Sequence, residues 1–429
     1  MPGGLIQLTV TGKQNKVLTG QPEMTYFKYA YKQHTNFACE SIAQTFDGKI
    51  DFGNKISSKI TRNGDLVTNM TLEITLPDVR SMTDSVNSDG STTIVNWVNA
   101  IGHRIIENIS IEIGGQVIDR HTGEWLELNS ELTMKEGQKQ AYYKMIKKEE
   151  FYYIRDVDQQ VVVYIPFQFW FCRETGLALP LVALQYHDVK VDISLRKLNE
   201  CINYHDRKVD GTYRATLPEY VPRPDLGRIS ITNARLLCDY VYLDVCERKW
   251  YAQHSHKYLI EQIQYNGSEG VITSSDYKQF LDFNHACKEL IWYLERTDKT
   301  HPNDWLNFSR IDNTDKYSWG SSSNADIMKS MKLYLNGIER VEERSADYFR
   351  LVNSFSYHTR NPNNYIYSYS FALYPEKINP SGALNFSQID EIFLHLKNHS
   401  NFNYTLHTYA KNYNMLVITQ GMGGLVFNV

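Results

Sequence analysis

The feature that most constrains this chain is a pattern that it contains twice. Residues 109–128 (ISIEIGGQVIDRHTGEWLEL) and 331–351 (MKLYLNGIERVEERSADYFRL) each read as an alternating strand, a glycine turn, a second short strand and an aromatic-bearing helical turn. The two turn glycines, Gly115 and Gly337, are separated by about half of the 429-residue chain. Solenoid repeats recur every ~20–50 residues. The much longer spacing here predicts two similar globular domains.

Short alternating segments bounded by turn residues recur in both halves, as expected for antiparallel strands. The first half has them at Ser41–Phe46, Lys55–Thr61, Leu66–Leu76, Arg104–Ile113, Val117–Asp119, Val161–Phe171 and Val189–Leu195. The second half repeats the order at Tyr258–Tyr265, Glu289–Leu294, Tyr365–Leu373 and Ile389–Leu396. Two packed sheets protect the edges of such strands. We therefore predict an all-β fold of two tandem eight-stranded antiparallel jelly rolls, a double jelly roll, with a few short helices in loops.

Composition divides the chain further. Residues 1–24 are rich in Gly, Thr and Lys and predict an extended N-terminal arm outside any core. Residues 25–211 then form the first jelly roll, residues 212–227 a linker stiffened by three prolines, and residues 228–429 the second jelly roll. A short helix is expected after Thr122, with Trp125, Leu128 and Leu132 on one face. Residues 134–150 predict a second, charged helix.

The charge balance and the cysteines indicate which ligands and which cellular compartment suit this protein. The 45 basic and 49 acidic residues give a net charge of −4 and a pI near 6.4. This balance disfavours a grip on phosphate backbones, so no direct nucleic-acid binding is expected. Six scattered cysteines without a C-x-x-C pair favour buried free thiols in a reducing compartment over zinc or disulfide frameworks. The N-terminal residues lack the ~7–15-residue apolar core of a signal peptide, so secretion by that route is not expected, and the longest apolar runs are far shorter than the ~20 residues that span a bilayer.

The best candidate for a metal site is His254-Ser-His256 followed by Glu261. In a strand, positions 254 and 256 point to the same side, so two imidazoles and one carboxylate could share an ion. The pattern resembles the first motif of cupins, which are also jelly rolls. It departs from that motif at Arg248, where a glycine is expected, and no second motif follows. A bicupin-type enzyme is therefore an alternative, whereas the main expectation is no cofactor and no enzyme.

Loop residues give a third hypothesis, a carbohydrate-binding β-sandwich, which depends on exposed Trp and Tyr side chains. The long polar segment Asp298–Asp326 holds Trp305 and Trp319. Glycosylation is a separate matter: among the Asn-x-Ser/Thr sequons, Asn266 and Asn307 are the candidates, since Asn69 and Asn108 fall in predicted strands. Catalytic motifs such as G-x-S-x-G, a Walker loop or H-E-x-x-H do not occur.

The N-terminal region carries a more specific signal. It contains, in order, Gly3-Gly4-Leu5, Leu18-Thr19-Gly20, Thr25-x-Phe27-Lys28, Thr35-Asn36-Phe37-Ala38-x-Glu40, Phe52-Gly53 and Arg62-Asn63-Gly64-Asp65-Leu66. This series resembles the opening of the major capsid proteins of nucleocytoplasmic large icosahedral DNA viruses of the chlorella-virus type. The segments LNGIER and NYNMLVITQGMGGLVF in the second half are consistent with the same family.

The resemblance implies a structural protein of the virion. Three copies would form a pseudo-hexagonal homotrimeric capsomer that tiles an icosahedral shell, after assembly in the host cytoplasm. By the same analogy the N-terminal arm would lie at the capsomer base, near minor capsid proteins and, through them, an internal membrane. The long loops, including Asp298–Asp326, would form its outer towers. The internal duplication supplies the physical reason, because six similar domains give a trimer a nearly six-fold shape.

Overall fold

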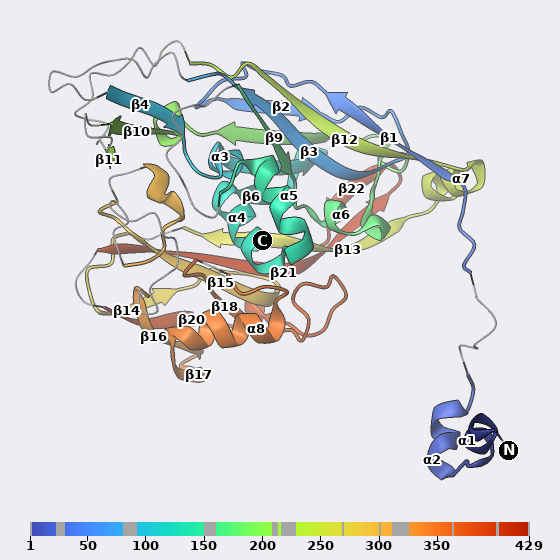
Figure 1. Cartoon of the computed structure of the whole chain (residues 1–429). Coiled ribbons are helices and arrows are strands. Elements are labelled where there is room, and N and C mark those ends of the chain that lie inside the picture. Colours follow the sequence, from blue (N-terminus) through green and yellow to red (C-terminus); the bar gives the residue numbers. More distant parts are fainter. Residues whose placement is uncertain are drawn as a thin grey trace. The chain divides into compact units, whose positions relative to one another are not determined.

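The computed structural model describes residues 2–22, 31–79, 92–149, 160–207, 213–215, 229–267, 270–299, 302–310, 326–362, 364–399 and 403–427 (Figure 1). The chain divides into two compact units, Met1–Phe37 and Ala38–Val429. The larger unit holds both jelly rolls. No helix among the described residues is both long enough and apolar enough to cross a membrane.

The N-terminal unit is helical, so the expectation of an extended arm is wrong. Its helices are α1 (Gly3–Thr9) and α2 (Lys13–Thr19), and neither buries a residue. The hydrogen bonds are local: the Thr9 hydroxyl donates to the Ile6 carbonyl at 3.0 Å, and the Gly12 amide donates to the Asn15 side chain at 3.0 Å. Neither helix buries a side chain, and the assignment of residues 1–24 as an arm outside any core stays a prediction.

The first jelly roll consists of two main sheets and a smaller one. One sheet has the order β1 (Phe37–Gln44), β12 (Asn233–Leu243), β3 (Leu66–Leu76) and β7 (Val161–Pro166), with β8 (Leu179–Pro180) also paired to β3. The other has the order β2 (Lys55–Lys59), β9 (Val189–Leu195), β5 (Ile106–Ile113) and β6 (Gln116–Thr122). The smaller sheet contains β11 (Tyr213–Ala215), β10 (Ile202–Arg207) and β4 (Thr92–Trp97).

The two main sheets of the second jelly roll repeat the strand order of the first. One sheet has the order β13 (His256–Asn266), β21 (Tyr404–Thr419), β15 (Ala286–Arg296) and β18 (Tyr367–Ser370), extended by β19 (Leu384–Asn385) and β22 (Met422–Leu425). The other has the order β14 (Asp276–Phe280), β20 (Ile392–Asn398), β16 (Met328–Leu335) and β17 (Ile338–Ser345). The identical order of four strands in both sheets confirms the predicted double jelly roll.

Short helices connect the strands. They are α3 (Ile101–Arg104), α4 (Gly123–Thr133), α5 (Glu136–Ile146), α6 (Trp170–Arg173), α7 (Val245–Gln253) and α8 (Asn353–Tyr357), which continues a π-helical turn at Tyr348–Val352. Single 3-10 turns occupy Thr175–Leu177, Leu198–Glu200, Pro302–Leu306 and Phe386–Gln388. Both helices expected between residues 122 and 150 are present, as α4 and α5.

One predicted strand is too long. The segment Val161–Phe171 is extended only as far as Pro166, and the chain then turns into α6. Aromatic packing explains the turn, since Phe169 is fully buried and stacks on His121 with ring centroids 4.7 Å apart. A continuing strand would keep Phe167, Phe169 and Phe171 on the core face but would point Trp170, which is only 2% exposed, away from the core.

The pairing of strand β12 indicates where the boundary between the two jelly rolls lies. It lies within the range 228–429 expected for the second jelly roll, but it pairs with β3 of the first, with Leu236 opposite Leu72. It takes the place in its sheet that β21, the long last strand, takes in the other half. Most of the expected linker 212–227 lies outside the described residues. We propose to place the boundary after β12, in the segment that contains α7.

The two hydrophobic cores share residues across the domains. The core of the first jelly roll includes Ile260, Leu416 and Ile418 from the second. The core of the second includes Trp125 and other α4 residues from the first. The two jelly rolls therefore do not have separate, self-contained cores.

The six cysteines are all free thiols. Cys201, Cys238 and Cys287 are buried, as expected, and burial raises the pKa of each. Cys39 and Cys246, however, are exposed, so burial is the wrong expectation for these two. Cys39 lies in β1 and Cys246 in the first turn of α7.

Gly123 allows a test of the tight packing at the start of α4. A Cβ atom at this position would overlap the backbone carbonyl oxygens of His103 and Ile106. We expect Gly123→Ala to lower the free energy of unfolding by about 1–3 kcal/mol, because the backbone has to shift. Gly137→Ala in α5 is the matched control, since nothing lies within 4 Å of its Cβ. Urea midpoints at equal protein concentration compare the two; an unchanged Gly123→Ala midpoint contradicts the prediction.

Candidate functional site

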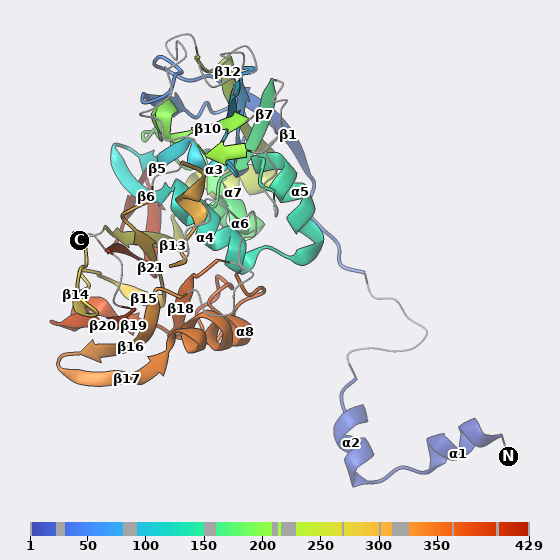
Figure 2. The same cartoon turned by 60° about the vertical axis from the view of Figure 1, so that its left-hand side comes forward.

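The junction between the two jelly rolls is the part of the structure where distant chemistry-bearing residues meet. Helix α4 is its centre, and both Figure 1 and Figure 2 show it between the two groups of strands. The helix begins because the Thr122 hydroxyl accepts a hydrogen bond from the Trp125 amide at 3.1 Å. The same hydroxyl lies 2.9 Å from the Tyr409 hydroxyl of the second jelly roll, and the rings of Trp125 and Tyr409 are 5.4 Å apart.

The predicted apolar face of α4 is therefore confirmed, and its partner is the other domain. Trp125, Leu128 and Leu132 are each at most 2% exposed and belong to the second jelly roll's core. The chain after α8 closes over the end of this helix, since the Arg360 amide donates to the Leu132 carbonyl at 3.1 Å. The aromatic and aliphatic anchors of the first domain thus fix the position of the second.

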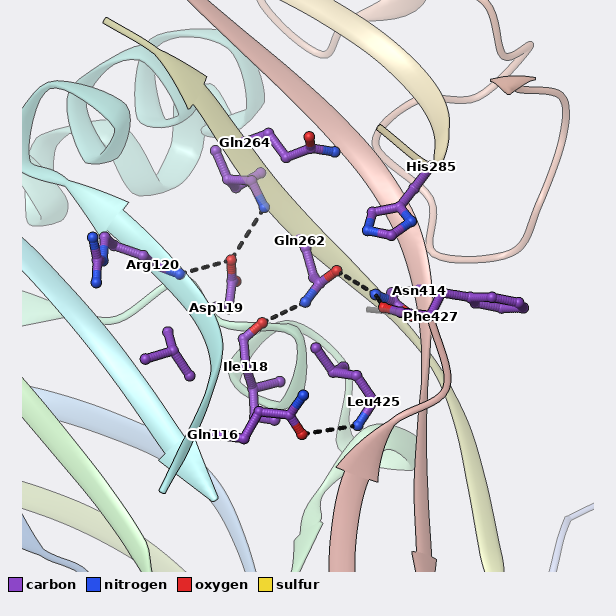
Figure 3. Close-up of a pocket in the computed structure, with 12 residues that line it drawn as sticks. Gln116, Ile118, Asp119, Arg120, Gln262, Gln264, His285, Asn414, Leu425 and Phe427 are labelled. Carbon is purple, nitrogen blue, oxygen red and sulfur yellow. Dashed lines mark hydrogen bonds between the residues drawn. The ribbon is translucent and has the colours of Figure 1, made fainter. Parts of the chain in front are cut away.

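Two edge strands, β6 and β13, meet at a second part of the junction (Figure 3). Side chains join the two strands. The Gln262 side-chain amide donates to the Ile118 backbone carbonyl, and the Ile263 backbone amide donates to an Asp119 carboxylate oxygen at 3.1 Å. Asn414 in turn donates to the Gln262 side chain at 2.8 Å. These bonds partner edge groups that would otherwise be free to pair with another chain.

A hollow of about 550 Å3 lies beside this seam and is lined by residues such as Gln116, His285 and Phe427. Several of its polar groups are already occupied. The Gln116 side chain accepts from the Leu425 amide at 3.3 Å, and the Gln264 side chain donates to the Asn284 carbonyl at 2.7 Å. The hollow is accordingly part of the hydrogen-bonded seam.

A buried cluster of charges crosses the junction at Glu261. Its carboxylate contacts Lys288 and Lys411 of the second jelly roll and Arg173 of α6 in the first. Burial raises the Glu261 pKa, but Lys411, Arg173 and Lys288 outweigh burial and lower this pKa to about 2. Lys288 is fully buried, and burial together with Lys411 lowers its pKa to about 7, against the opposing effect of Glu261. A single carboxylate thus holds three cations together.

Carboxylates of α4 form a second charged cluster. Glu127 and Glu131 are both buried and both contact Lys148, and Glu131 also lies 3.3 Å from Arg360 of the second jelly roll. Burial raises the pKa of Glu127, but Lys148 and His103 lower it to about 2 overall. A third cluster consists of His358 with the carboxylates of Glu289 and Glu376.

Sequence reasoning missed these clusters, although a signal was present. Lys288 and Glu289 are buried directly before the apolar run Leu290–Leu294 of strand β15, and Lys411 is buried opposite Glu289 in β21. A charged side chain inside a buried strand requires a partner of opposite charge. The opposite charge is Glu261 of β13, and Arg173 of the other domain contacts the same carboxylate, a contact that sequence periodicity does not show.

The structure does not bring the three predicted metal-site residues together. His254 ends α7 instead of lying in a strand, and its Nδ1 is 2.9 Å from the Trp250 carbonyl. His256 is buried with Nε2 2.8 Å from the Tyr251 carbonyl. Glu261 is held by the three cations described above. Within the described part of the chain, no group of three His, Cys, Asp or Glu residues could hold a metal ion.

The sequons and loop aromatics differ in exposure. Asn266 ends β13 and is half-buried, whereas Asn307 is only 5% exposed and accepts a hydrogen bond from the Ser309 hydroxyl at 2.6 Å. Trp305 is buried and donates to the Asn99 carbonyl at 3.0 Å, so the hypothesis that it is an exposed carbohydrate-binding ring is wrong. Trp319 lies outside the described residues.

Comparisons with known proteins agree with the fold. The family model described as "Major capsid protein N-terminus" matches residues 25–244, and the model described as "Large eukaryotic DNA virus major capsid protein" matches residues 247–424. Strand β12 thus falls in the first match, as the sheet pairing indicates. The chain belongs to the major capsid proteins of large eukaryotic DNA viruses.

Individual relatives cover the whole chain. The major capsid protein of Pyramimonas orientalis virus is 36% identical and that of Phaeocystis pouchetii virus 34% identical, with 100% of each chain covered in both comparisons. Among solved structures, a quasi-atomic model of the PBCV-1 virus capsid has 29% identity and a TM-score of 0.75, covering 94% of this chain and 100% of the other. The chain is a structural protein of the virion capsid.

The Glu261 cluster gives a prediction about charge balance. Glu261→Gln removes the carboxylate that Lys288, Lys411 and Arg173 share, so we expect it to lower the free energy of unfolding by about 3–5 kcal/mol. Lys288→Met is the comparison, because Lys411 and Arg173 still neutralise Glu261 and the apolar side chain fills the same space. Urea denaturation measures both. A larger loss of unfolding free energy for Lys288→Met than for Glu261→Gln contradicts the conclusion that Glu261 is the carboxylate that balances this cluster.

His358 gives a prediction about pH. Its Nε2 lies 2.5 Å from Glu289 and its Nδ1 3.3 Å from Glu376. Burial lowers the His358 pKa, but these carboxylates raise it to about 9 overall. Since the folded pKa is raised, the stabilisation is fully present below about pH 6.5 and is lost as the pH rises through about 9. We expect a stability difference between parent and His358→Gln on the order of 3 kcal/mol that shrinks over this range. A difference independent of pH contradicts this.

Proposed function

We propose that this capsid protein assembles as a pseudo-hexagonal homotrimeric capsomer that tiles an icosahedral virus shell. The observation that carries the proposal is the repeated strand order: β2-β9-β5-β6 in one half matches β14-β20-β16-β17 in the other, and the second pair of sheets matches likewise. Three such chains present six similar jelly rolls around one axis. Homo-oligomers usually have closed symmetry, and a contact between two different surfaces forms a ring when its rotation closes.

The junction supports this function because a shell subunit has to hold its two domains in one fixed orientation. Buried anchors on α4, the hydrogen-bonded edge strands and the shared charge cluster at Glu261 all cross between the domains. Function then depends on shape and contact surfaces. We propose that the chain uses no cofactor and has no catalytic activity, since His254, His256 and Glu261 are engaged with structural partners.

The N-terminal helices are the proposed contact with other components of the virion. Leu8, Val17 and Leu18 are at least 74% exposed, so they present apolar side chains that a partner protein could cover. We propose that minor capsid proteins bind this segment and link the capsomer to an internal membrane. With a net charge of −4, direct contact with nucleic acid is not expected. Assembly is proposed to take place in the host cytoplasm.

The trimer is tested by mass and shape. We expect the purified protein to have a mass of three 49.9 kDa chains by light scattering, and a hexagonal outline in negative-stain images. The trimer should persist on dilution, because obligate interfaces bury roughly 2,000 Å2 or more. A monomer at every concentration, or a dimer, contradicts the proposal.

A further inference from the structure

The helical segment after β17 is the counterpart of α4. Its sequence SADYFRL (345–351) aligns with TGEWLEL (122–128), and each segment directly follows the second strand of the repeated hairpin. At the same spacing, Leu351 corresponds to Leu128 and Phe355 to Leu132. In the first jelly roll these positions anchor α4 in the neighbouring domain.

The counterparts differ sharply in exposure. Leu128 and Leu132 are 0% and 1% exposed, whereas Leu351 is 39% and Phe355 80% exposed. Val352, which lies beside Leu351, is 51% exposed. Phe355 lies four residues after Leu351 and three after Val352, so both side chains neighbour Phe355 on the helix surface. We call Leu351, Val352 and Phe355 the α8 face. It retains the apolar character of an anchor, but among the described residues of the larger unit these side chains stay exposed.

The surface that receives α4 identifies the matching receptor. Trp125 packs on Tyr409 in β21, where the strand register places Tyr409 opposite Ile291 and His407 opposite Tyr293. Tyr409 and Tyr293 are each only 1% exposed. Strand β12 occupies in the first jelly roll the position of β21 in the second. The sheet β1-β12-β3-β7 is therefore the counterpart of the surface that α4 covers.

Part of that counterpart surface is exposed to solvent among the described residues, although Glu73 at its centre is only 7% exposed. Tyr164 lies opposite Glu73, and Arg235 lies opposite Glu73 on its other side, so the three side chains share one face of the sheet. Val162, two residues from Tyr164 in β7, lies on the same face. Val162 and Tyr164 are 36% and 38% exposed, and the Arg235 side chain is 51% exposed. We call Val162, Tyr164 and Arg235 the β7–β12 face.

We propose that the α8 face of one copy packs on the β7–β12 face of a second copy, repeating between subunits the contact that α4 makes within the chain. Figure 1 and Figure 2 show α8 on the side of the second jelly roll that faces away from the first, where another molecule can reach the helix. The contact joins two different surfaces, so each copy can bind one neighbour through its α8 face and another through its β7–β12 face. Three copies then form a closed ring. This inference rests on the proposed trimer and names the surfaces that form it.

The test uses paired substitutions in the full chain. The helix variant carries Leu351→Asp with Phe355→Asp, and the sheet variant carries Val162→Asp with Tyr164→Asp. The control is Val271→Asp, at an apolar residue that is also 53% exposed but belongs to neither face. We expect the control to keep the mass of three copies and each variant to have the mass of one copy, with unchanged circular dichroism.

Mixing the two variants tests which surfaces meet. The helix variant retains an intact β7–β12 face and the sheet variant an intact α8 face, so an equimolar mixture can form one contact and no ring. We expect a mass of two copies at high concentration. A helix or sheet variant that keeps the parental trimer overturns the contact alone, whereas a monomeric parent overturns the trimer and the contact together. If the helix variant unfolds, the sheet variant alone decides between these outcomes.

Discussion

The packing of α4 against the second jelly roll is the contact on which the rest of the structure depends. Trp125, Leu128 and Leu132 leave their own domain and complete the core of the other, so neither core is closed without both domains. Apolar burial supplies the driving force but little direction. The Thr122 cap and its contact with Tyr409 add that direction, because hydrogen bonds require a particular geometry.

Buried charges make the arrangement more selective. Taking Glu261 and Lys288 out of water costs free energy, and their mutual attraction offsets this cost only when every partner is in place. Arg173 comes from the first domain, so a displaced second domain would leave buried charge without compensation. We infer that the clusters contribute less to the overall stability than to the choice of one relative orientation, which a subunit of a regular shell needs.

Duplication links this orientation to assembly. One jelly roll presents α4 to a partner within the chain, and the other presents the equivalent segment, with Leu351 and Phe355, to solvent. A ring of three chains would give every such segment an equivalent receptor. The two kinds of contact need not be identical, since Trp125 is replaced by Tyr348 and Leu132 by Phe355. Their positions in the repeated topology are the same.

Local sequence patterns determined much of this structure. Alternation and turn residues were sufficient for the bounds of β3 and β9, for the helix after Thr122 and for the two-domain repeat, because these features depend on neighbours in the chain. The N-terminal signature was sufficient for the family. Patterns failed where contacts between distant residues decide the structure: the chain turns into α6 after Pro166 and buries Trp170, and β12 joins a sheet whose other strands lie far away in the sequence.

The junction itself was decided only by the tertiary structure. His254, His256 and Glu261 have a spacing that fits a metal site, yet the end of α7 separates the histidines and three cations surround the carboxylate. Burial and opposite charge act through space, and residues such as Arg173 and Glu261 meet only after both domains have folded. The sequence by itself therefore determined which elements form and that they form twice. How the two copies face each other depended on contacts between residues far apart in the chain.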